Sequence, residues 1–156
     1  MGAAGSGKTV VGRALAAELG WPFADADDFH SAANVEKMRR GIGLTDADRE
    51  PWLAAMHQAI ARAAERREHL ALACSALKER YRQTLRGDVR GVRFVHLEAD
   101  EATLARRLRD RQHHFAGPSL LASQLRDLEP PCHALTVDAT QPIDRIVAAI
   151  RYAFGL

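Results

Sequence analysis

The sequence has little cysteine, little lysine and little net charge, and each scarcity excludes a class of protein. Its 156 residues include two cysteines, Cys74 and Cys132, which stand far apart and without metal-ligand spacing. We expect both to be reduced thiols, as in a cytoplasmic protein. Lysine occurs only at positions 8, 37 and 78, and the formal net charge is +2. So weak a positive charge gives no reason to expect a nucleic-acid partner.

Long hydrophobic runs are also lacking. No stretch has the length of a membrane span, and we find no signal peptide, internal repeat or low-complexity tract. The 47% hydrophobic and 27% charged fractions are those of an ordinary soluble globular protein. We therefore expect a single domain over residues 1–156, located in the cytoplasm, with no contact to nucleic acid or membrane.

The most informative stretch lies at the start of the chain. Residues 2–9 read GAAGSGKT and match the phosphate-binding pattern G-x-x-x-x-G-K-[ST]. The glycines allow backbone angles that aim successive N–H groups at one anion, and helical periodicity begins at once over 10–19. The pattern predicts binding of ATP or GTP, in which Lys8 contacts the β- and γ-phosphates and Thr9 binds Mg²⁺. The expected nucleotide-binding residues of this loop are Gly2, Gly5, Ser6, Gly7, Lys8 and Thr9.

A phosphate-binding loop of this kind normally follows a buried β-strand, whereas here only Met1 precedes it. Three explanations are open: a start further upstream, a truncation, or a sheet that tolerates the gap. We favour a start site that has been placed too late.

The rest of the chain alternates short apolar runs with helical periodicity. Strands are expected over 21–26, 70–73, 92–97 and 135–137, and further helices over 32–40, 45–67, 76–85, 101–112, 119–128 and 143–154. This alternation predicts an α/β fold with a parallel sheet and helices on both faces. Ligands of such sheets bind beyond the carboxyl ends of the strands. The phosphate loop, residues 25–28 and residues 75–78 should converge there, which indicates an enzyme.

Two acidic residues, Asp25 and Asp27, close the first of these strands. One could hold Mg²⁺ through water, and the other could accept the proton of a substrate hydroxyl. The alternative is a solvated acidic turn. Beside a phosphate-binding loop we favour the functional interpretation.

Several basic residues could bind an anionic substrate. Arg49 could clamp a carboxylate with two parallel hydrogen bonds. Lys78 and Arg82 are expected one turn apart on a helix, where they could face an anion. For each of these residues a solvated surface position is the alternative.

Arg107 and Arg111 share the same spacing and stand directly before a break in the helical pattern at 113–118. Arginines that enter a flexible lid suit phosphoryl transfer, because positive charge must arrive as the transition state forms. We discount the adjacent His113 and His114 as metal ligands.

Five stretches together resemble the gluconate kinase (gluconokinase) family of small phosphate-loop kinases. They are GAAGSGKT at 2–9, DADDFHSAANVEKMRRGIGLTDADREPWL at 25–53, CSALKERYRQTLR at 74–86, RLRDRQHHF at 107–115 and VDATQP at 137–142. Many families share the loop, but the blocks D-x-D-x-x-H, N-x-E-K-M, D-R-x-P-W and C-S-A-L-K are much more specific. The resemblance covers nearly the whole chain.

The resemblance implies the fold of the nucleoside-monophosphate and shikimate kinases. This fold is a three-layer α/β sandwich whose five-stranded parallel sheet has the order 2-3-1-4-5, and here its central first strand is missing. The implied reaction is phosphorylation of D-gluconate by ATP with Mg²⁺, giving 6-phosphogluconate in carbohydrate metabolism. Members of the family are commonly homodimers.

The resemblance also implies roles for individual residues. Asp27 would bind and deprotonate the reacting hydroxyl, with Asp25 nearer the metal. Arg107 would stack on adenine, beside the loop at 138–142, and Arg111 would contact phosphates. The residues with catalytic roles would be Lys8, Asp27 and Arg111. The residues that bind the sugar acid would be Asp27, His30, Arg49, Lys78 and Arg82.

One segment departs from the family pattern. The expected lid spans roughly 112–124, and the residues AGPS after Phe115 do not match it. Two alternative functions are a kinase of the same fold that acts on another small hydroxy acid, such as shikimate, and a non-catalytic nucleotide-binding relative without the first strand. The blocks D-R-x-P-W and C-S-A-L-K argue against shikimate.

Overall fold

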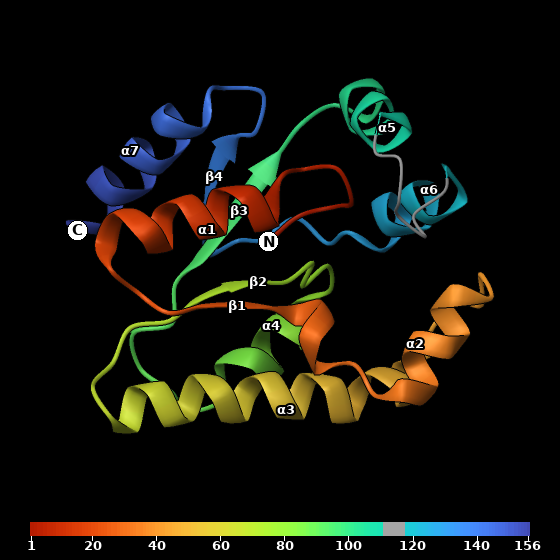
Figure 1. The fold of residues 1–156 in the computed structure, drawn as a ribbon, viewed down its shortest axis with the longest axis horizontal. Helices are drawn as coiled ribbons and strands as arrows, with labels where there is room; N and C mark the ends of the chain where they lie inside the picture. Colours follow the sequence, from red (N-terminus) through yellow and green to blue (C-terminus); the bar gives the residue numbers. More distant parts are fainter. Residues whose placement is uncertain (111–117) are drawn as a thin grey trace.

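Two pairs of parallel strands form the centre of the protein (Figure 1). The computed structural model describes residues 1–110 and 118–156. Strand β1 (Phe23–Asp25) pairs with β2 (Ala71–Ala73), and β3 (Phe94–Glu98) pairs with β4 (Ala134–Asp138). All strands are short, and both pairings are parallel, as the alternation of strands and helices predicts.

Helices cover both faces of these strand pairs. Helix α3 (Asp46–Glu65) packs against α4 (Glu79–Arg86) on one face, and α1 (Lys8–Leu19) packs against α7 (Ile143–Phe154) on the other. The remaining helical elements are the 3₁₀ helix η1 (Ala26–Phe29), α2 (Ala32–Arg39), α5 (Glu101–Arg109) and α6 (Pro118–Asp127). Figure 1 shows α2, α5 and α6 at the same end of the molecule.

Separate apolar cores hold the layers together. Trp52, Met56 and Leu85 are buried between the strands and α3 and α4, where Phe94 of β3 joins them. Leu97 of β3 lies in a second core with residues of α1 and α7. Strand β3 therefore buries alternate side chains on opposite faces, as a strand between two helical layers must. This is the predicted three-layer α/β sandwich.

The boundaries of several elements follow from local chemistry. Helix α3 begins at a capping box, in which the Thr45 hydroxyl accepts from the Asp48 amide and the Asp48 carboxylate accepts from the Thr45 amide. Pro51 lies in the first turns of this helix, where its missing N–H costs little. Helix α1 ends at Gly20, which has a φ of 67°, a backbone conformation that glycine adopts without strain.

The predicted elements are found, mostly with shorter bounds. The strand expected over 21–26 is reduced to Phe23–Asp25, because the chain turns into η1 at Ala26. The helix expected over 76–85 begins only at Glu79, with Lys78 as its N-cap residue. The helix over 143–154 has the expected bounds. No helix in the described part of the chain is long and apolar enough to cross a membrane.

Between β2 and β3 the described residues contain no strand, but the first two residues of the chain bridge them. The amino group of Met1 donates to the Val95 carbonyl, and the Leu97 amide donates to the Met1 carbonyl at 2.9 Å. On the other side the Gly2 amide donates to the Ser75 carbonyl at 3.2 Å. The two strand pairs are those expected on either side of a central first strand, whereas a continuous five-stranded sheet is not found in the described residues.

The buried amino group of Met1 predicts a specific pH dependence of stability. Burial, with a smaller contribution from Lys8, lowers the pKa of this group from 8.0 to about 5. Between these two values the unfolded chain binds more protons than the folded one, so the free energy of unfolding should rise with pH from 5 to 8. Urea unfolding across this range measures the slope. Acetylation of the amino group should flatten the slope, and equal slopes in both forms would contradict the prediction.

Candidate active site

The phosphate-binding loop has the backbone that its glycines permit. Gly5 and Gly7 have φ values of 85° and 90°, and a Cβ on Gly5 would lie 2.9 Å from the Leu104 carbonyl oxygen. Helix α1 begins directly after Gly7, so its first N–H groups and its positive dipole end face the loop. The Lys8 ammonium lies over the loop and donates to the Ala3 carbonyl at 3.0 Å. These features together form a site for phosphate groups.

A hydrogen bond between Thr9 and Asp25 links this loop to β1. The Thr9 hydroxyl donates to one carboxylate oxygen of Asp25 at 2.8 Å, and the other oxygen accepts from the Asp27 amide at 3.2 Å. A hydroxyl and a carboxylate in contact beside a phosphate loop are the oxygen ligands that Mg²⁺ takes. No cluster of three or more His, Cys, Asp or Glu suited to a metal occurs in the described residues, so a Mg²⁺ ion here would rely on substrate phosphates and water.

Asp27 lies on η1, and His30 is the C-cap residue at its end. Trp52 fixes this turn, because its indole N–H donates to the Ala26 carbonyl at 2.7 Å and its ring stacks on His30 at 4.7 Å. The buried Nδ1 of His30 has no hydrogen-bond partner among the described residues. Burial lowers the pKa of His30, Arg49 lowers it further, and Asp27 opposes them. These influences favour the neutral imidazole of His30, and its buried Nδ1 is a polar atom without a partner among the described residues.

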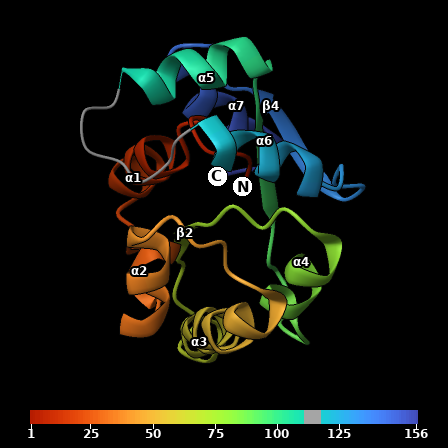
Figure 2. The same cartoon turned by 90° about the vertical axis from the view of Figure 1, so that its right-hand side faces the viewer.

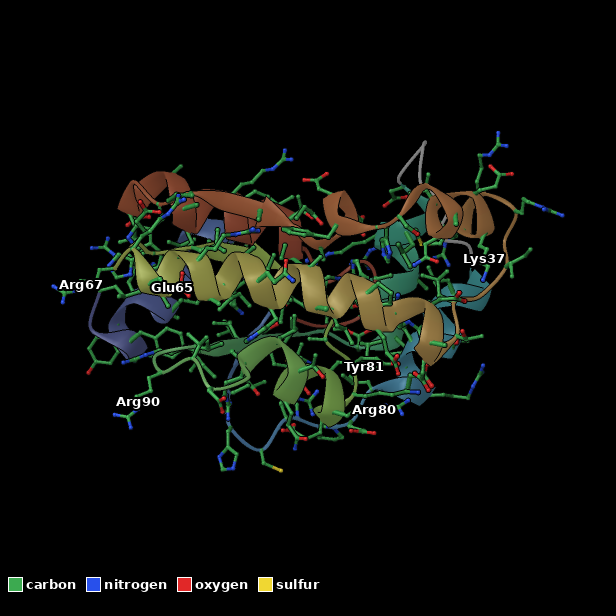
Figure 3. The ribbon with its side chains drawn as sticks, turned by 90° about the horizontal axis from the view of Figure 1, so that it is seen from below. Lys37, Glu65, Arg67, Arg80, Tyr81 and Arg90 are labelled. Atoms are coloured by element: carbon green, nitrogen blue, oxygen red, sulfur yellow. The ribbon has the colours of Figure 1, made fainter. Side chains whose placement is uncertain are left out.

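Three cations gather near the N-terminal end of α3. The Asp46 carboxylate accepts from the Tyr81 hydroxyl and pairs with Arg80. Lys78 and Arg49 lie farther away, each with a nitrogen 3.8 Å from the same carboxylate. Figure 3 shows Arg80 and Tyr81 at this end of α3, with Glu65 at the other.

This cluster has more positive than negative charge. The hydrogen bonds from Tyr81 and Arg80 lower the pKa of Asp46, so its carboxylate is ionised at neutral pH. One carboxylate then faces three cations, of which Arg49 also donates to the Tyr81 hydroxyl at 3.2 Å, and the Arg49 and Lys78 nitrogens stay 3.8 Å from Asp46. Such an arrangement can accept a second carboxylate from a ligand.

Arg82 has different surroundings from Lys78. It is 3% exposed, and its guanidinium donates to the carbonyls of Ala76, Leu77 and Glu129 and to the Glu79 carboxylate. Helix α4 starts after Lys78, so the two side chains do not share a helix face. The contacts of Arg82 fix the loop that follows β2, where Ala76 has a positive φ of 44°.

Arg107 joins the phosphate loop to the loop after β4. Its guanidinium donates to the Ala139 carbonyl at 2.8 Å and to the Gly5 carbonyl at 3.5 Å. In the same loop, hydrogen bonds from Thr140 and Gln141 lower the pKa of Asp138 to about 2. This is the position in which the sequence placed the adenine-contacting residues.

The expected lid is described only in part. Arg111 and residues 112–117 of the lid lie outside the described residues, and α6 covers the remainder. From α6 the Gln124 side chain accepts from the Ala4 amide at 2.7 Å. The lid region is thus attached to the phosphate loop by a contact that the sequence did not predict.

The structure brings most predicted residues to one end of the molecule. Figure 2 views this end, with α5 and α6 above and α2 and α3 below. Sequence reasoning missed Trp52, which orients His30, and the residues Asp46, Arg80 and Tyr81. All of them lie within the sequence blocks that carry the family resemblance, next to Arg49 or Lys78, and that proximity was the available signal.

Comparison with known proteins identifies the family. Residues 1–131 match the family described as AAA domain. The gluconokinase of Gluconobacter oxydans is 49% identical over 131 residues, which cover 84% of this chain and 74% of that protein. A probable gluconokinase of Xenopus tropicalis is 43% identical, with 96% and 88% covered.

The chain belongs to the gluconokinase family. Solved structures agree: a gluconokinase from Sinorhizobium meliloti superimposes with a TM-score of 0.87 at 43% identity, covering 99% of this chain and 89% of that one. A sugar kinase from Janibacter sp. gives a TM-score of 0.90 at 39% identity, with 97% and 90% covered. An APS kinase of Mycobacterium tuberculosis, at 17% identity and a TM-score of 0.71, shares the fold.

The contacts of Arg82 predict a large stability effect in this gluconokinase-family chain. Arg82→Met would remove the buried guanidinium that donates to the carbonyls of Ala76, Leu77 and Glu129 and to the Glu79 carboxylate, so we expect it to lower the free energy of unfolding by about 3 kcal/mol. Arg80→Met removes an exposed ion pair and should cost less than about 1 kcal/mol. Urea unfolding of both variants measures the difference. A loss at Arg82 no larger than that at Arg80 would contradict the structural role.

Proposed function

We propose that this protein transfers the γ-phosphate of ATP to a hydroxyl of D-gluconate, giving 6-phospho-D-gluconate and ADP. The observation that carries the proposal is that a phosphate-binding loop and the cluster of Arg49, Lys78 and Arg80 both follow the carboxyl ends of the strands. The names of the similar proteins support gluconate as the acceptor. A sugar acid suits this cluster because it has both a carboxylate for the cations and a hydroxyl to phosphorylate.

The nucleotide side of the reaction is assigned to the loop and its neighbours. The N–H groups of residues 2–9 and the Lys8 ammonium hold the β- and γ-phosphates. Thr9 and Asp25 would hold Mg²⁺, which neutralises phosphate charge when bound. Arg107, which donates to the carbonyls of Gly5 and Ala139, is proposed to flank adenine. Arg111 is proposed to contact the transferred phosphate.

The acid side of the reaction is assigned to η1, α3 and the start of α4. Asp27 accepts the proton of the attacking hydroxyl, and His30 binds a sugar hydroxyl. Arg49 and Lys78 bind the carboxylate. Arg82, whose donors are occupied by backbone carbonyls, fixes the loop that leads to Lys78. We further propose a homodimer, as the family resemblance implies, and a cytoplasmic location, as the two expected free thiols suggest.

ADP release from purified protein tests the proposed function. Activity should require ATP, Mg²⁺ and D-gluconate together, and shikimate in place of gluconate should give none. Activity with shikimate but not with gluconate would show that the acceptor is a hydroxy acid other than gluconate. Absence of turnover with every acid, in a folded protein that binds ATP, would indicate a non-catalytic relative.

Asp27→Asn tests the proposed base. The amide cannot accept the hydroxyl proton, so we expect kcat to fall by about 100-fold or more, with ATP affinity nearly unchanged. The matched control is Asp28→Asn, which alters the neighbouring exposed carboxylate and should retain turnover. Near-normal kcat in Asp27→Asn would exclude its role as base.

Arg49→Lys tests the carboxylate clamp. Lysine keeps the charge but loses the two parallel donors, so the KM for gluconate should rise about tenfold while the KM for ATP changes little. Steady-state kinetics with each substrate varied in turn gives the two KM values separately. An equal rise in both KM values would refute a clamp on the acid.

A further inference from the structure

The phosphate-binding loop lies against helices α5 and α6 (Figure 1). Ala3, the second residue of the loop, is 4% exposed and shares a small apolar core with Leu104 of α5 and Leu121 of α6. At Gly5 the loop approaches α5 so closely that a Cβ would lie 2.9 Å from the Leu104 carbonyl oxygen. The shape of the loop therefore depends on contacts with both helices.

Gln124 adds a hydrogen bond to these apolar contacts. Its side-chain oxygen accepts from the Ala4 amide at 2.7 Å. Gln124 follows Leu121 by three residues on α6, and residues with this spacing lie on the same face of a helix. One face of α6 thus holds Ala3 by apolar contact and Ala4 by a hydrogen bond.

The peptide group between Ala3 and Ala4 is held at both ends. Its N–H, which belongs to Ala4, donates to Gln124. Its carbonyl, which belongs to Ala3, accepts from the Lys8 ammonium at 3.0 Å and from the Ser6 amide at 3.2 Å. A peptide group is planar, so a rotation that moves its N–H also moves its C=O. The bond to Gln124 therefore helps to set the direction of the carbonyl that holds Lys8.

We propose that Gln124 is a positioning residue for Lys8. By fixing the peptide between Ala3 and Ala4, it holds the ammonium group at the place where the nucleotide phosphates bind. An amide suits this position because its oxygen accepts a hydrogen bond without a negative charge, which would repel the phosphates. The inference concerns the nucleotide and does not depend on which acid is phosphorylated.

Binding of ATP with Mg²⁺, measured by calorimetry without any acid, tests this inference in two variants. Gln124→Met removes the acceptor of the Ala4 N–H at a similar side-chain length, whereas Gln124→Glu keeps an acceptor but brings a negative charge to the loop. The matched controls are Gln83→Met and Gln83→Glu, at an exposed glutamine of α4. Thermal unfolding identifies which variants are folded.

We expect Gln124→Met to raise the Kd for ATP about fivefold or more, because one hydrogen bond that positions the loop is lost. Gln124→Glu should raise the Kd further, through repulsion between the carboxylate and the phosphates. Both Gln83 variants should bind ATP as the unmodified protein does. An unchanged or lower Kd in either folded Gln124 variant would overturn the proposal.

A double-mutant cycle with Lys8→Met tests the route through Lys8. If Gln124 acts by placing the ammonium group, Gln124→Met should change the Kd for ATP by less than about twofold when Lys8 is already absent. An equal change with and without Lys8 would mean that Gln124 supports the loop as a whole, which would overturn its role as a positioning residue for Lys8. Absence of turnover with D-gluconate would contradict the proposed function and leave these binding results unaffected.

Discussion

The Asp25 carboxylate is the contact on which the arrangement of the site depends. One of its oxygens accepts from the Thr9 hydroxyl at the start of α1, and the other accepts from the Asp27 amide at the start of η1. One side chain thereby fixes the phosphate-binding loop relative to the turn that carries Asp27 and His30. An amide at this position would retain only one acceptor oxygen, so it could not make both bonds.

The turn after Asp25 explains why neighbouring acidic residues can serve different purposes. Strand β1 ends at Asp25, and Trp52 ties the next residue, Ala26, to α3. Asp27 therefore leaves the strand direction and lies on the side of His30, whose pKa it influences. Both carboxylates come from a single short segment, yet one contacts Thr9 at the phosphate loop and the other lies near His30.

The sequence predicted the order of elements because each has a local signal. The glycines and lysine of the loop, the periodicity of α1 and α7, and the cap at Thr45 all act within a few residues. The predictions were less accurate where the backbone conformation depends on hydrogen bonds to a side chain elsewhere in the sequence. Helix α4 starts only at Glu79, because Arg82 binds the carbonyls of Ala76 and Leu77. The spacing of residues along the sequence does not indicate that contact.

The same limit applies to the cation cluster around Asp46, because sequence periodicity could not reveal the role of this carboxylate. Like charges gathered at one place repel one another, so Arg49, Lys78 and Arg80 need an anion among them. Asp46 supplies it, and the Tyr81 hydroxyl fixes the position of its carboxylate. Because Arg80 takes the close contact while Arg49 and Lys78 stay at 3.8 Å, the cluster is held together and keeps a net positive charge. A ligand carboxylate can then gain the attraction of two cations whose arrangement has already been established by folding.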